Sequence, residues 1–296
     1  MKNKKGSYTM EERILGKTGL KVSVFAFGGI VVRQTSAGEA AAAVAEAIDR
    51  GVTYFDVAPS YGDSQQMLGP ALQPHRSKVS LACKTKFRTR AEALADLENS
   101  LKLLRTDYFD VYQMHAMEPG EVDTVLGPGG AVEALVEAKQ KGLVRNIGFS
   151  SHFDEAALRL IRAFSFDTLL FPVNWACRLK NGLSEAALAE AAGNNMGRIA
   201  IKSLANRAKD PTDDGFPKCW YRPLFDDPAL AELALRYTLS QDVHTAVSPG
   251  DIRMLRLGLD IVEKYHGKPA PLSPEELDEL KNRALGVKET VFAPVA

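Results

Sequence analysis

Four ionisable side chains stand at or just after the ends of three consecutive apolar runs, and their types could support proton transfer. The run YFDVAP carries Asp56, and Tyr61 follows in the next few residues. VSLACKTK carries Lys84, and YFDVYQMHA carries His115. A phenol titrates near ~10, and a neighbouring ammonium lowers that value. Because an aspartate would keep the lysine charged and oriented, the phenol could donate a proton near neutral pH.

A histidine beside such a phenol could hydrogen bond to a carbonyl oxygen and orient it. The four groups together suit the protonation of an oxygen while a hydride reaches the adjacent carbon. Each residue also has an ordinary explanation: Tyr61 as loop packing, Asp56 as a turn cap, Lys84 as a solvated strand end, and His115 as a core histidine. Their joint placement at neighbouring run ends favours the catalytic hypothesis.

The elements that must position these groups are eight short apolar runs, separated by stretches of helical period. The runs begin at Val22, Tyr54, Val79, Tyr108, Val144, Thr168, Arg198 and Thr245. Between them, Ala and Leu recur at three- and four-residue spacing, as one buried helix face requires. Strands that are apolar on successive residues, each followed by a helix, indicate a parallel sheet covered by helices. Eight such units predict a (β/α)8 barrel, whose functional groups lie at the C-terminal ends of the strands.

An open doubly wound sheet is the alternative fold. It would usually carry a GxGxxG turn after its first strand, which FAFGGIVVRQTSAGEA lacks. The barrel is therefore preferred, as a single domain over residues 1–296 with two additions. EERILGKTGLKVS predicts an N-terminal β-hairpin, and SPEELDELKNRALG predicts an extra C-terminal helix that starts from a serine N-cap. Residues 1–10 are basic and no apolar segment follows them, so they are interpreted as a flexible leader and not a secretory signal.

Composition argues against several classes of function. Lys+Arg and Asp+Glu both number 37, so no overall charge attracts nucleic acid or an anionic membrane. No window approaches ~18 uninterrupted apolar residues, so no membrane span is expected. The three cysteines form no CxxC pair, and the five histidines form no HxH or HxxxH pair, so no metal site is expected. A protein of the reducing cytoplasm with a small-molecule partner fits best, and the sequence does not indicate its oligomeric state.

Five motifs, in this order, resemble those of the aldo-keto reductases: LGKTGLKVS, DVAPSYG, KTK, DVYQMH and IGFSSH. The resemblance extends over about residues 15–265. It implies that Tyr61 is the general acid/base, that Lys84 lowers the pKa of Tyr61, that Asp56 pairs with Lys84, and that His115 positions the carbonyl. The implied activity is the reduction of aldehydes or ketones to alcohols with NADPH, with NADH also possible. Two alternatives stay open: an NAD(H)-preferring alcohol or sugar dehydrogenase, and a nucleotide-sensing regulatory subunit with weak turnover.

The resemblance also implies an extended cofactor across the barrel mouth. Ser150 and Ser151 would meet the nicotinamide carboxamide, or would instead cap the helix that begins near Asp154. Lys202 and Ser203 stand where many family members carry an aromatic residue and a serine. Lys202 would either reach the cofactor pyrophosphate as a point charge or point outward into solvent.

The segment SPGDIRMLRLGLD resembles the family's adenosine-phosphate site at the start of a helix. Arg256 aligns with the arginine that binds the 2′-phosphate, and Arg253 lies one turn before it. Asp251 would cap the helix or accept a ribose hydroxyl, although its charge opposes a phosphate. The cofactor contacts expected from this segment are Gly250, Asp251, Arg253, Arg256 and Asp260.

The loops after the fourth and seventh runs and the C-terminal tail would shape the substrate pocket. Trp175, just past the sixth run, is the expected apolar wall. The loop after the seventh run carries an aromatic cluster that either closes over a ligand or, as preferred here, packs the loop onto the barrel. The cluster consists of Phe216, Trp220, Tyr221 and Phe225.

Overall fold

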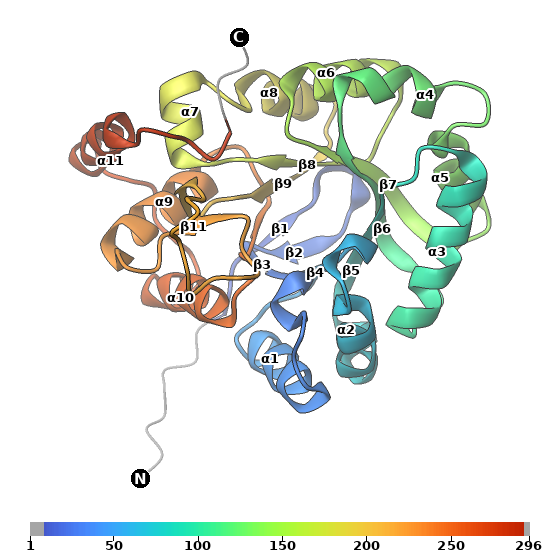
Figure 1. Cartoon of the computed structure of the whole chain (residues 1–296), viewed down its shortest axis with the longest axis horizontal. Coiled ribbons are helices and arrows are strands. Elements are labelled where there is room, and N and C mark those ends of the chain that lie inside the picture. Colours follow the sequence, from blue (N-terminus) through green and yellow to red (C-terminus); the bar gives the residue numbers. More distant parts are fainter. Residues whose placement is uncertain (1–8, 293–296) are drawn as a thin grey trace.

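The computed structural model describes residues 9–292, which form a closed barrel of eight parallel strands surrounded by helices (Figure 1). The strands are β3 (Phe25–Gly28), β4 (Tyr54–Asp56), β5 (Ser80–Thr85), β6 (Phe109–Met117), β7 (Val144–Ser151), β8 (Thr168–Pro172), β9 (Gly197–Ile201) and β12 (Thr245–Val247). They pair in this order, and β12 closes the barrel against β3. The predicted (β/α)8 barrel is therefore confirmed, and every predicted run overlaps one of its strands.

The helices cover the outer face of the barrel. They are α1 (Ala37–Asp49), α2 (Ser64–Leu72), α3 (Arg90–Leu104), α4 (Val122–Leu126), α5 (Ala131–Gln140), α6 (Asp154–Ala163), α7 (Trp175–Asn181), α8 (Glu185–Gly193), α9 (Pro228–Ser240) and α10 (Ile252–Lys264). Among residues 9–292, none of these helices combines the length and the apolar character needed to cross a bilayer.

The two predicted additions are also present. Strands β1 (Glu12–Ile14) and β2 (Lys21–Ser23) form an antiparallel hairpin. Leu15 follows β1 and is fully buried in the cluster that fills the barrel interior, so the hairpin closes the N-terminal end of the barrel. Helix α11 (Pro274–Gly286) begins at Ser273, whose side chain forms a capping box with Glu276.

The predicted leader lies largely outside the described residues, which begin at residue 9. Its last residue, Met10, is buried and belongs to the main hydrophobic core. An added Cβ on Gly51 would come within 2.9 Å of the Met10 Cβ, so the chain packs closely here. The prediction of a flexible leader is therefore wrong at Met10, because this apolar side chain is buried in the hydrophobic core.

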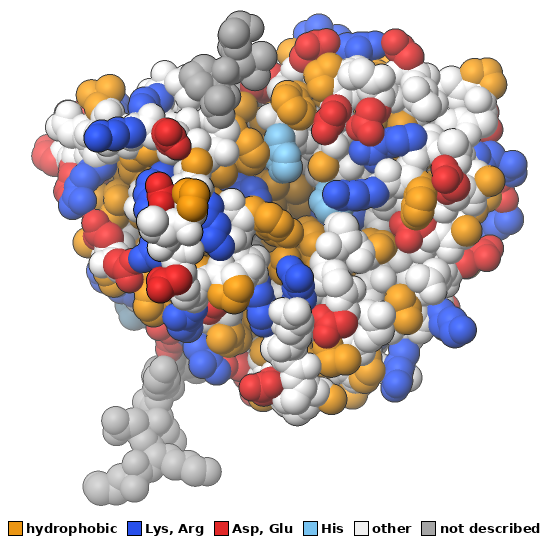
Figure 2. Space-filling model, in the orientation of Figure 1, with side chains coloured by type: hydrophobic (Ala, Val, Ile, Leu, Met, Phe, Trp, Pro, Cys, Tyr) orange, Lys and Arg blue, Asp and Glu red, His pale blue; other side chains and the backbone are white. Residues whose placement is uncertain are grey.

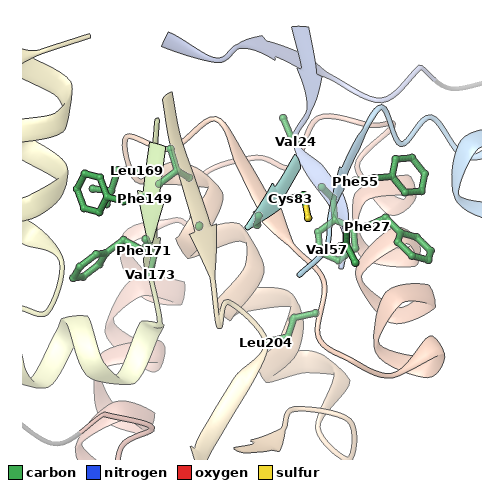
Figure 3. Packing of buried hydrophobic residues seen from close by; sticks show 14 of the residues in the cluster. Val24, Phe27, Phe55, Val57, Cys83, Phe149, Leu169, Phe171, Val173 and Leu204 are labelled. Carbon is green, nitrogen blue, oxygen red and sulfur yellow. The ribbon is translucent and has the colours of Figure 1, made fainter. Parts of the chain in front are cut away.

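Most of the core lies between the strands and the covering helices (Figure 3). Phe27, Phe55, Phe149 and Phe171 are fully buried there. Helix α10 approaches β3 closely, because a Cβ on Gly258 would lie 2.2 Å from the ring of Phe25. Since the hairpin closes the other end, the open face is the one at which the parallel strands end. A second hairpin, β10 (Ala205–Ala208) and β11 (Tyr221–Pro223), follows β9 and contributes to this face.

Candidate active site

A cavity of about 410 Å³ opens at the C-terminal ends of the strands. Figure 2 shows this face hollowed near its centre, with histidine side chains and lysine or arginine side chains around the hollow. Asp56, Tyr61, Lys84 and His115 all line the cavity. The structure thus brings together the four residues that the sequence singled out.

Asp56 and Lys84 form a buried ion pair between the neighbouring strands β4 and β5. The Lys84 ammonium donates a hydrogen bond to Asp56 Oδ2, and Gln113 Nε2 donates to Asp56 Oδ1 over 3.3 Å. Burial alone would lower the pKa of Lys84, but the Asp56 carboxylate and the Tyr61 phenol raise it above its usual value. Lys84 is therefore positively charged at neutral pH.

Tyr61 lies in a single 3-10 turn, η3 (Pro59–Tyr61), just beyond β4. Pro59 opens the turn, and Gly62 ends it with a φ of 66°, a left-handed conformation that favours glycine. The Ser64 hydroxyl donates to the Tyr61 carbonyl over 2.8 Å and fixes the turn. The ammonium of Lys84 lies 5.4 Å from the centroid of the Tyr61 ring.

The pKa of Tyr61 departs from the sequence-based expectation. Burial raises the pKa of this phenol, and the charge of Lys84 lowers it without cancelling the effect of burial. The predicted influence of the lysine is present, but the predicted net lowering is wrong. Tyr61 therefore carries its proton at neutral pH.

His115 reaches the cavity from a bulge in β6. The pairing of β6 with β7 shifts between Met114 and Met117, and Ala116 has a φ of 52°. Such a bulge re-aims a side chain. The His115 ring lies edge-on to the Tyr61 ring, with 5.9 Å between their centroids.

The protonation state of His115 follows from its surroundings. Burial, followed by the positive charge of Lys84, lowers the pKa of His115 to about 2, so the imidazole is neutral at pH 7. Its Nδ1 lies 3.3 Å from the Ser60 hydroxyl. If Ser60 donates to Nδ1, the other ring nitrogen carries the hydrogen and can donate it to a ligand oxygen.

The two serines at the end of β7 have different positions. Ser150 lines the cavity, and its Oγ accepts the backbone N–H of Ala116 over 2.7 Å. Ser151 lies outside the cavity lining, and its hydroxyl donates to the Met117 carbonyl over 2.7 Å. Neither serine is the N-cap of α6, because Phe153 holds that position. The structure therefore leaves Ser150, and not Ser151, facing a possible ligand.

Lys202 follows β9 and lines the cavity, so the alternative of an outward lysine is wrong. Burial lowers the pKa of Lys202 to about 8. Its ammonium lies 4.8 Å from the centroid of the Tyr221 ring and 5.3 Å from that of Trp220. The next residue, Ser203, is fully buried and lies outside the cavity lining, so this geometry gives no support to the predicted cofactor contact.

The segment predicted to bind the adenosine phosphate lies at the start of α10, where both of its arginines form ion pairs with carboxylates. Asp251 caps the helix by accepting the backbone N–H of Arg253, and it also pairs with the Arg253 guanidinium at 2.8 Å. Arg256 binds both carboxylate oxygens of Glu46 through Nε, at 3.1 Å each. Gly250 is the member of this set that lines the cavity.

Asp260, the last predicted contact of this segment, is exposed on α10 and pairs with Arg50 at 2.7 Å. It is not among the residues that line the cavity. Its interaction with α1 gives it a structural explanation, and the prediction that it contacts the cofactor has no support in this geometry.

Trp175 does not form a pocket wall, so this prediction is wrong. Trp175 is the first residue of α7, with 0% of its surface exposed, and its indole N–H donates to the Ala205 carbonyl over 3.0 Å. The tryptophan of the cavity is Trp220, which is 59% exposed and lies 5.9 Å from Tyr61 between ring centroids. Of the aromatic cluster, Trp220 and Tyr221 face the cavity, whereas Phe216 packs against Phe225.

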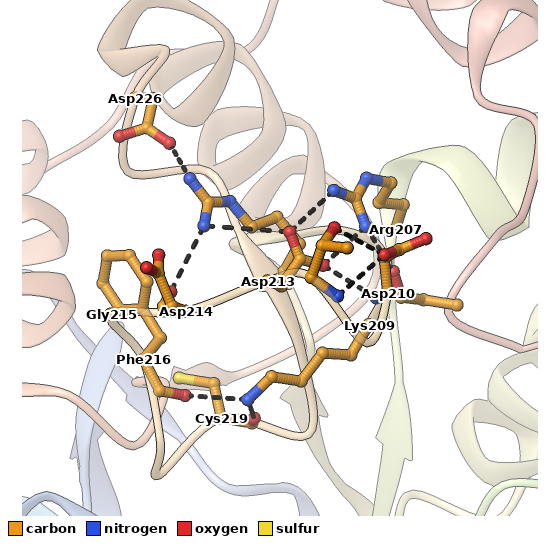
Figure 4. Close-up of polar contacts among 12 residues, drawn as sticks. Arg207, Lys209, Asp210, Asp213, Asp214, Gly215, Phe216, Cys219 and Asp226 are labelled. Atoms are coloured by element: carbon orange, nitrogen blue, oxygen red, sulfur yellow. Dashed lines mark hydrogen bonds and ion pairs between the residues drawn. The ribbon is translucent and has the colours of Figure 1, made fainter.

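The segment that carries Trp220 is held by its own polar contacts (Figure 4). Arg207 makes a bidentate pair with Asp213, at 2.7 and 2.8 Å. The Lys209 ammonium donates to the carbonyls of Phe216 and Cys219, at 3.2 Å each. These contacts fix the backbone immediately before the aromatic pair that lines the cavity.

Lys218 is a cavity residue that the sequence gave no reason to choose. Its ammonium donates to the Val31 carbonyl over 3.0 Å and so joins the β10–β11 segment to the loop after β3. Burial lowers the pKa of Lys218, and the nearby carboxylate of Asp251 partly restores it. An added Cβ on Gly250 would lie 2.4 Å from the Lys218 carbonyl, which shows how closely this loop approaches the start of α10.

Other cavity residues were also missed because they come from distant segments. His152 stacks on Phe292, with 4.8 Å between ring centroids, and both line the cavity together with Val291. The sequence predicted that the C-terminal tail helps to shape the pocket, but not which of its side chains would do so.

Comparison with protein families and with known proteins shows what the chain is similar to. The model described as "Aldo/keto reductase family" matches residues 25–209. An L-galactose dehydrogenase of Arabidopsis thaliana is 36% identical over 156 residues, 48% of each chain. An aldo-keto reductase of Bacillus subtilis, YhdN, is 31% identical over 161 residues, 48% of this chain and 47% of that protein. The chain thus spans about half the length of these curated relatives.

Solved structures show the same fold. An aldo-keto reductase of Bacillus halodurans in its holo form superimposes with a TM-score of 0.72 at 22% identity, over 97% of this chain and 98% of that one. An aldo-keto reductase structure from Pseudomonas aeruginosa gives a TM-score of 0.70 at 24% identity, over 86% of this chain and 96% of that one. At these identities the likeness concerns the fold alone.

Proposed function

Because this chain belongs to the aldo/keto reductase family, we propose that it reduces aldehydes or ketones to alcohols with NADPH, using Tyr61 as the general acid. The observation that carries the proposal is the convergence of Tyr61, the Lys84–Asp56 pair and His115 on one cavity. This set can supply a proton and orient a carbonyl oxygen at the same point.

A bound reduced nicotinamide would supply the hydride to the carbonyl carbon. The Tyr61 hydroxyl would donate its proton to the carbonyl oxygen, which completes the alcohol. Burial raises the pKa of Tyr61, so the proton is in place at neutral pH. The charged ammonium of Lys84 would stabilise the phenolate that remains. The neutral imidazole of His115 would hold the carbonyl oxygen by a hydrogen bond.

Several residues suit a nicotinamide dinucleotide. Ser150 would hydrogen bond to the carboxamide, and Lys218 and Gly250 would meet the pyrophosphate near the start of α10. Arg256 would bind the 2′-phosphate and Arg253 would support it. Within this proposal Lys218 adds a positive charge at the place where the sequence predicted a phosphate.

The Arg256–Glu46 pair must open for a 2′-phosphate to bind. Arg256 is 53% exposed as a side chain, and exposed ion pairs contribute only about 0–1 kcal/mol. A phosphate carries more charge than a carboxylate and accepts bidentate hydrogen bonds from a guanidinium. It can therefore replace Glu46 at a small cost.

A second candidate is an enzyme of the same fold that prefers NADH. The observation in its favour is that Asp251 and Glu46 already neutralise both arginines of the phosphate segment. A cofactor without the 2′-phosphate would leave these pairs undisturbed, and Asp251 could accept a ribose hydroxyl.

The decisive test is Tyr61→Phe, which removes the proton and keeps the ring. We expect the variant to bind NADPH with nearly unchanged affinity and to lose about 10²- to 10⁴-fold in carbonyl reduction. NADPH oxidation with benzaldehyde at pH 7 measures the loss, and cofactor titration measures binding. Near-full reduction by this variant would exclude Tyr61 as the acid.

A further inference from the structure

The cavity carries more positive than negative charge. Its lining contains one carboxylate, Asp56, which pairs with Lys84, and it also contains three more lysines and two histidines: Lys86, Lys202, Lys218, His115 and His152. The histidines are neutral at pH 7, because burial lowers their pKa values to about 2 and about 4. The cofactor pyrophosphate would compensate Lys218 in the proposed complex, but a neutral substrate would leave the charge of Lys202 uncompensated.

Lys202 has an unusual backbone conformation that its neighbours hold in place. Its φ is 68°, a left-handed conformation that is unfavourable for a lysine. Asn174 Nδ2 donates to the Lys202 carbonyl over 3.0 Å, and the Ala205 N–H donates to the same carbonyl over 3.1 Å. These bonds hold the strained backbone, and the side chain ends near the rings of Trp220 and Tyr221.

The ammonium of Lys202 has no oxygen partner within residues 9–292. Lys84 has a carboxylate, Lys218 has the Val31 carbonyl, and Lys86 is exposed to water. Lys202 is half-buried, and among the described residues its ammonium is recorded next to aromatic rings only, which attract a cation without accepting its hydrogen bonds. An anion that joins this partly desolvated ammonium would therefore stabilise it.

Lys202 also lies at the catalytic end of the cavity. After burial, the positive charge of Lys84 contributes to lowering the pKa of Lys202, and the charge of Lys202 in turn lowers the pKa of His152. Lys218, by contrast, senses Asp251 at the start of α10. The two lysines therefore serve different parts of the cavity, and Lys202 belongs with Tyr61 and Trp220, whose ring centroids lie 5.9 Å apart.

We propose that Lys202 binds the carboxylate of the substrate, so that the preferred substrates are aldehydes or ketones that also carry an acid group. The inference rests on the proposed carbonyl reductase function and names the substrate class for the same site. The carbonyl lies at Tyr61 and His115, the apolar part lies against Trp220, and the carboxylate accepts hydrogen bonds from the Lys202 ammonium. This assignment replaces the sequence-based expectation that Lys202 meets the cofactor pyrophosphate.

The first test compares 4-carboxybenzaldehyde with benzaldehyde as substrates. For the wild type, we expect a higher kcat/KM for the acid. Lys202→Met keeps the length of the side chain and removes the charge, and should lower the ratio of the two kcat/KM values at least about tenfold. Lys268→Met is the control, because Lys268 is exposed and lies outside the cavity lining, and it should change the ratio by less than about threefold.

Two results would overturn the assignment. If Lys202→Met lowers kcat/KM equally for both aldehydes, Lys202 contributes to the reduction of any aldehyde and does not select substrates that carry an acid group. If the variant mainly weakens NADPH binding and leaves the ratio unchanged, the anion at Lys202 is a phosphate of the cofactor. Titration of each variant with NADPH separates these two results.

A binding measurement separates this inference from the proposed function. Benzoate and benzyl alcohol are titrated into the wild type and into Lys202→Met by calorimetry, without cofactor. We expect benzoate to bind more tightly than benzyl alcohol in the wild type, and to lose this advantage in the variant. That result supports the carboxylate site even if neither aldehyde is reduced. Equal binding of both probes, together with active aldehyde reduction, would overturn the site and leave the function intact.

Discussion

The ammonium of Lys84 donates a hydrogen bond to the carboxylate of Asp56 in the barrel mouth, where only 1% and 3% of the two side chains are exposed. Gln113 donates a further hydrogen bond to the same carboxylate. Removing one partner from a buried pair leaves the other charge without compensation, which costs more than the pair itself contributes. We therefore expect the ion pair to stabilise the folded site, in addition to its role in the proposed mechanism.

Asp56→Asn should destabilise the fold by about 3 kcal/mol, because the Lys84 ammonium loses its counter-charge while it remains buried. Urea unfolding of wild type and variant measures the difference. Asp123→Asn is the control: Asp123 pairs with Arg159 at 2.7 Å but is 89% exposed, so its loss should cost less than about 1 kcal/mol. Equal small losses in the two variants would mean that the Lys84–Asp56 pair is not buried in solution.

The pH dependence of reduction should be flat through neutrality. In the proposed mechanism reduction needs the protonated phenol of Tyr61, and burial raises the pKa of this group above its usual value of ~10. The rate of reduction is therefore at its maximum below that pKa and falls as the pH rises through it. His115, with a pKa of about 2, stays neutral across the range and adds no break.

The measurement is kcat/KM for benzaldehyde between pH 5 and pH 10.5, since this quantity reports the groups of the free enzyme. A break near pH 6.5 would show that His115 titrates normally and that water reaches it. A break well below ~10 on the alkaline side would show that the charge of Lys84 outweighs burial at Tyr61.

The sequence was informative wherever an element fixes the direction of a side chain. Parallel strands that alternate with helices must end at one face, so Asp56, Lys84 and His115 could be brought together from their positions alone. Trp175 shows the limit of this reasoning. Its position just past β8 was predicted correctly. However, Trp175 is the first residue of a helix and its side chain is buried in the core, where its indole N–H donates a hydrogen bond to the Ala205 carbonyl.

Contacts between distant segments could not be read from local patterns. Glu46 and Arg256 are separated by 210 residues in the chain, yet their side chains pair. The net pKa shift of Tyr61 likewise depends on how much water the folded barrel excludes. The sequence indicated the neighbouring charges but not the extent of this burial. Lys218 became a candidate only because its loop folds back toward Val31.

Glu46→Gln should strengthen NADPH binding several-fold and leave NADH binding nearly unchanged. The substitution removes the carboxylate that competes with a 2′-phosphate for Arg256, and a neutral amide competes less well. Paired titrations with the two cofactors measure the effect, and Asp123→Asn serves again as a control without a role at the cavity. Equal changes for NADPH and NADH would remove Arg256 from the phosphate site.

Trp220→Phe should abolish most of the change in tryptophan fluorescence that accompanies ligand binding. The chain has two tryptophans, and Trp220 is 59% exposed at the cavity whereas Trp175 is fully buried. A ligand that enters beside Tyr61 would therefore alter the surroundings of Trp220 and leave those of Trp175 unchanged. Emission spectra during titration with NADPH and then with benzoate measure the response, and the remaining emission of Trp175 reports that the variant is folded. A full response in Trp220→Phe would mean that binding repacks the wall around α7, because Trp175 would then be the residue that senses the ligand.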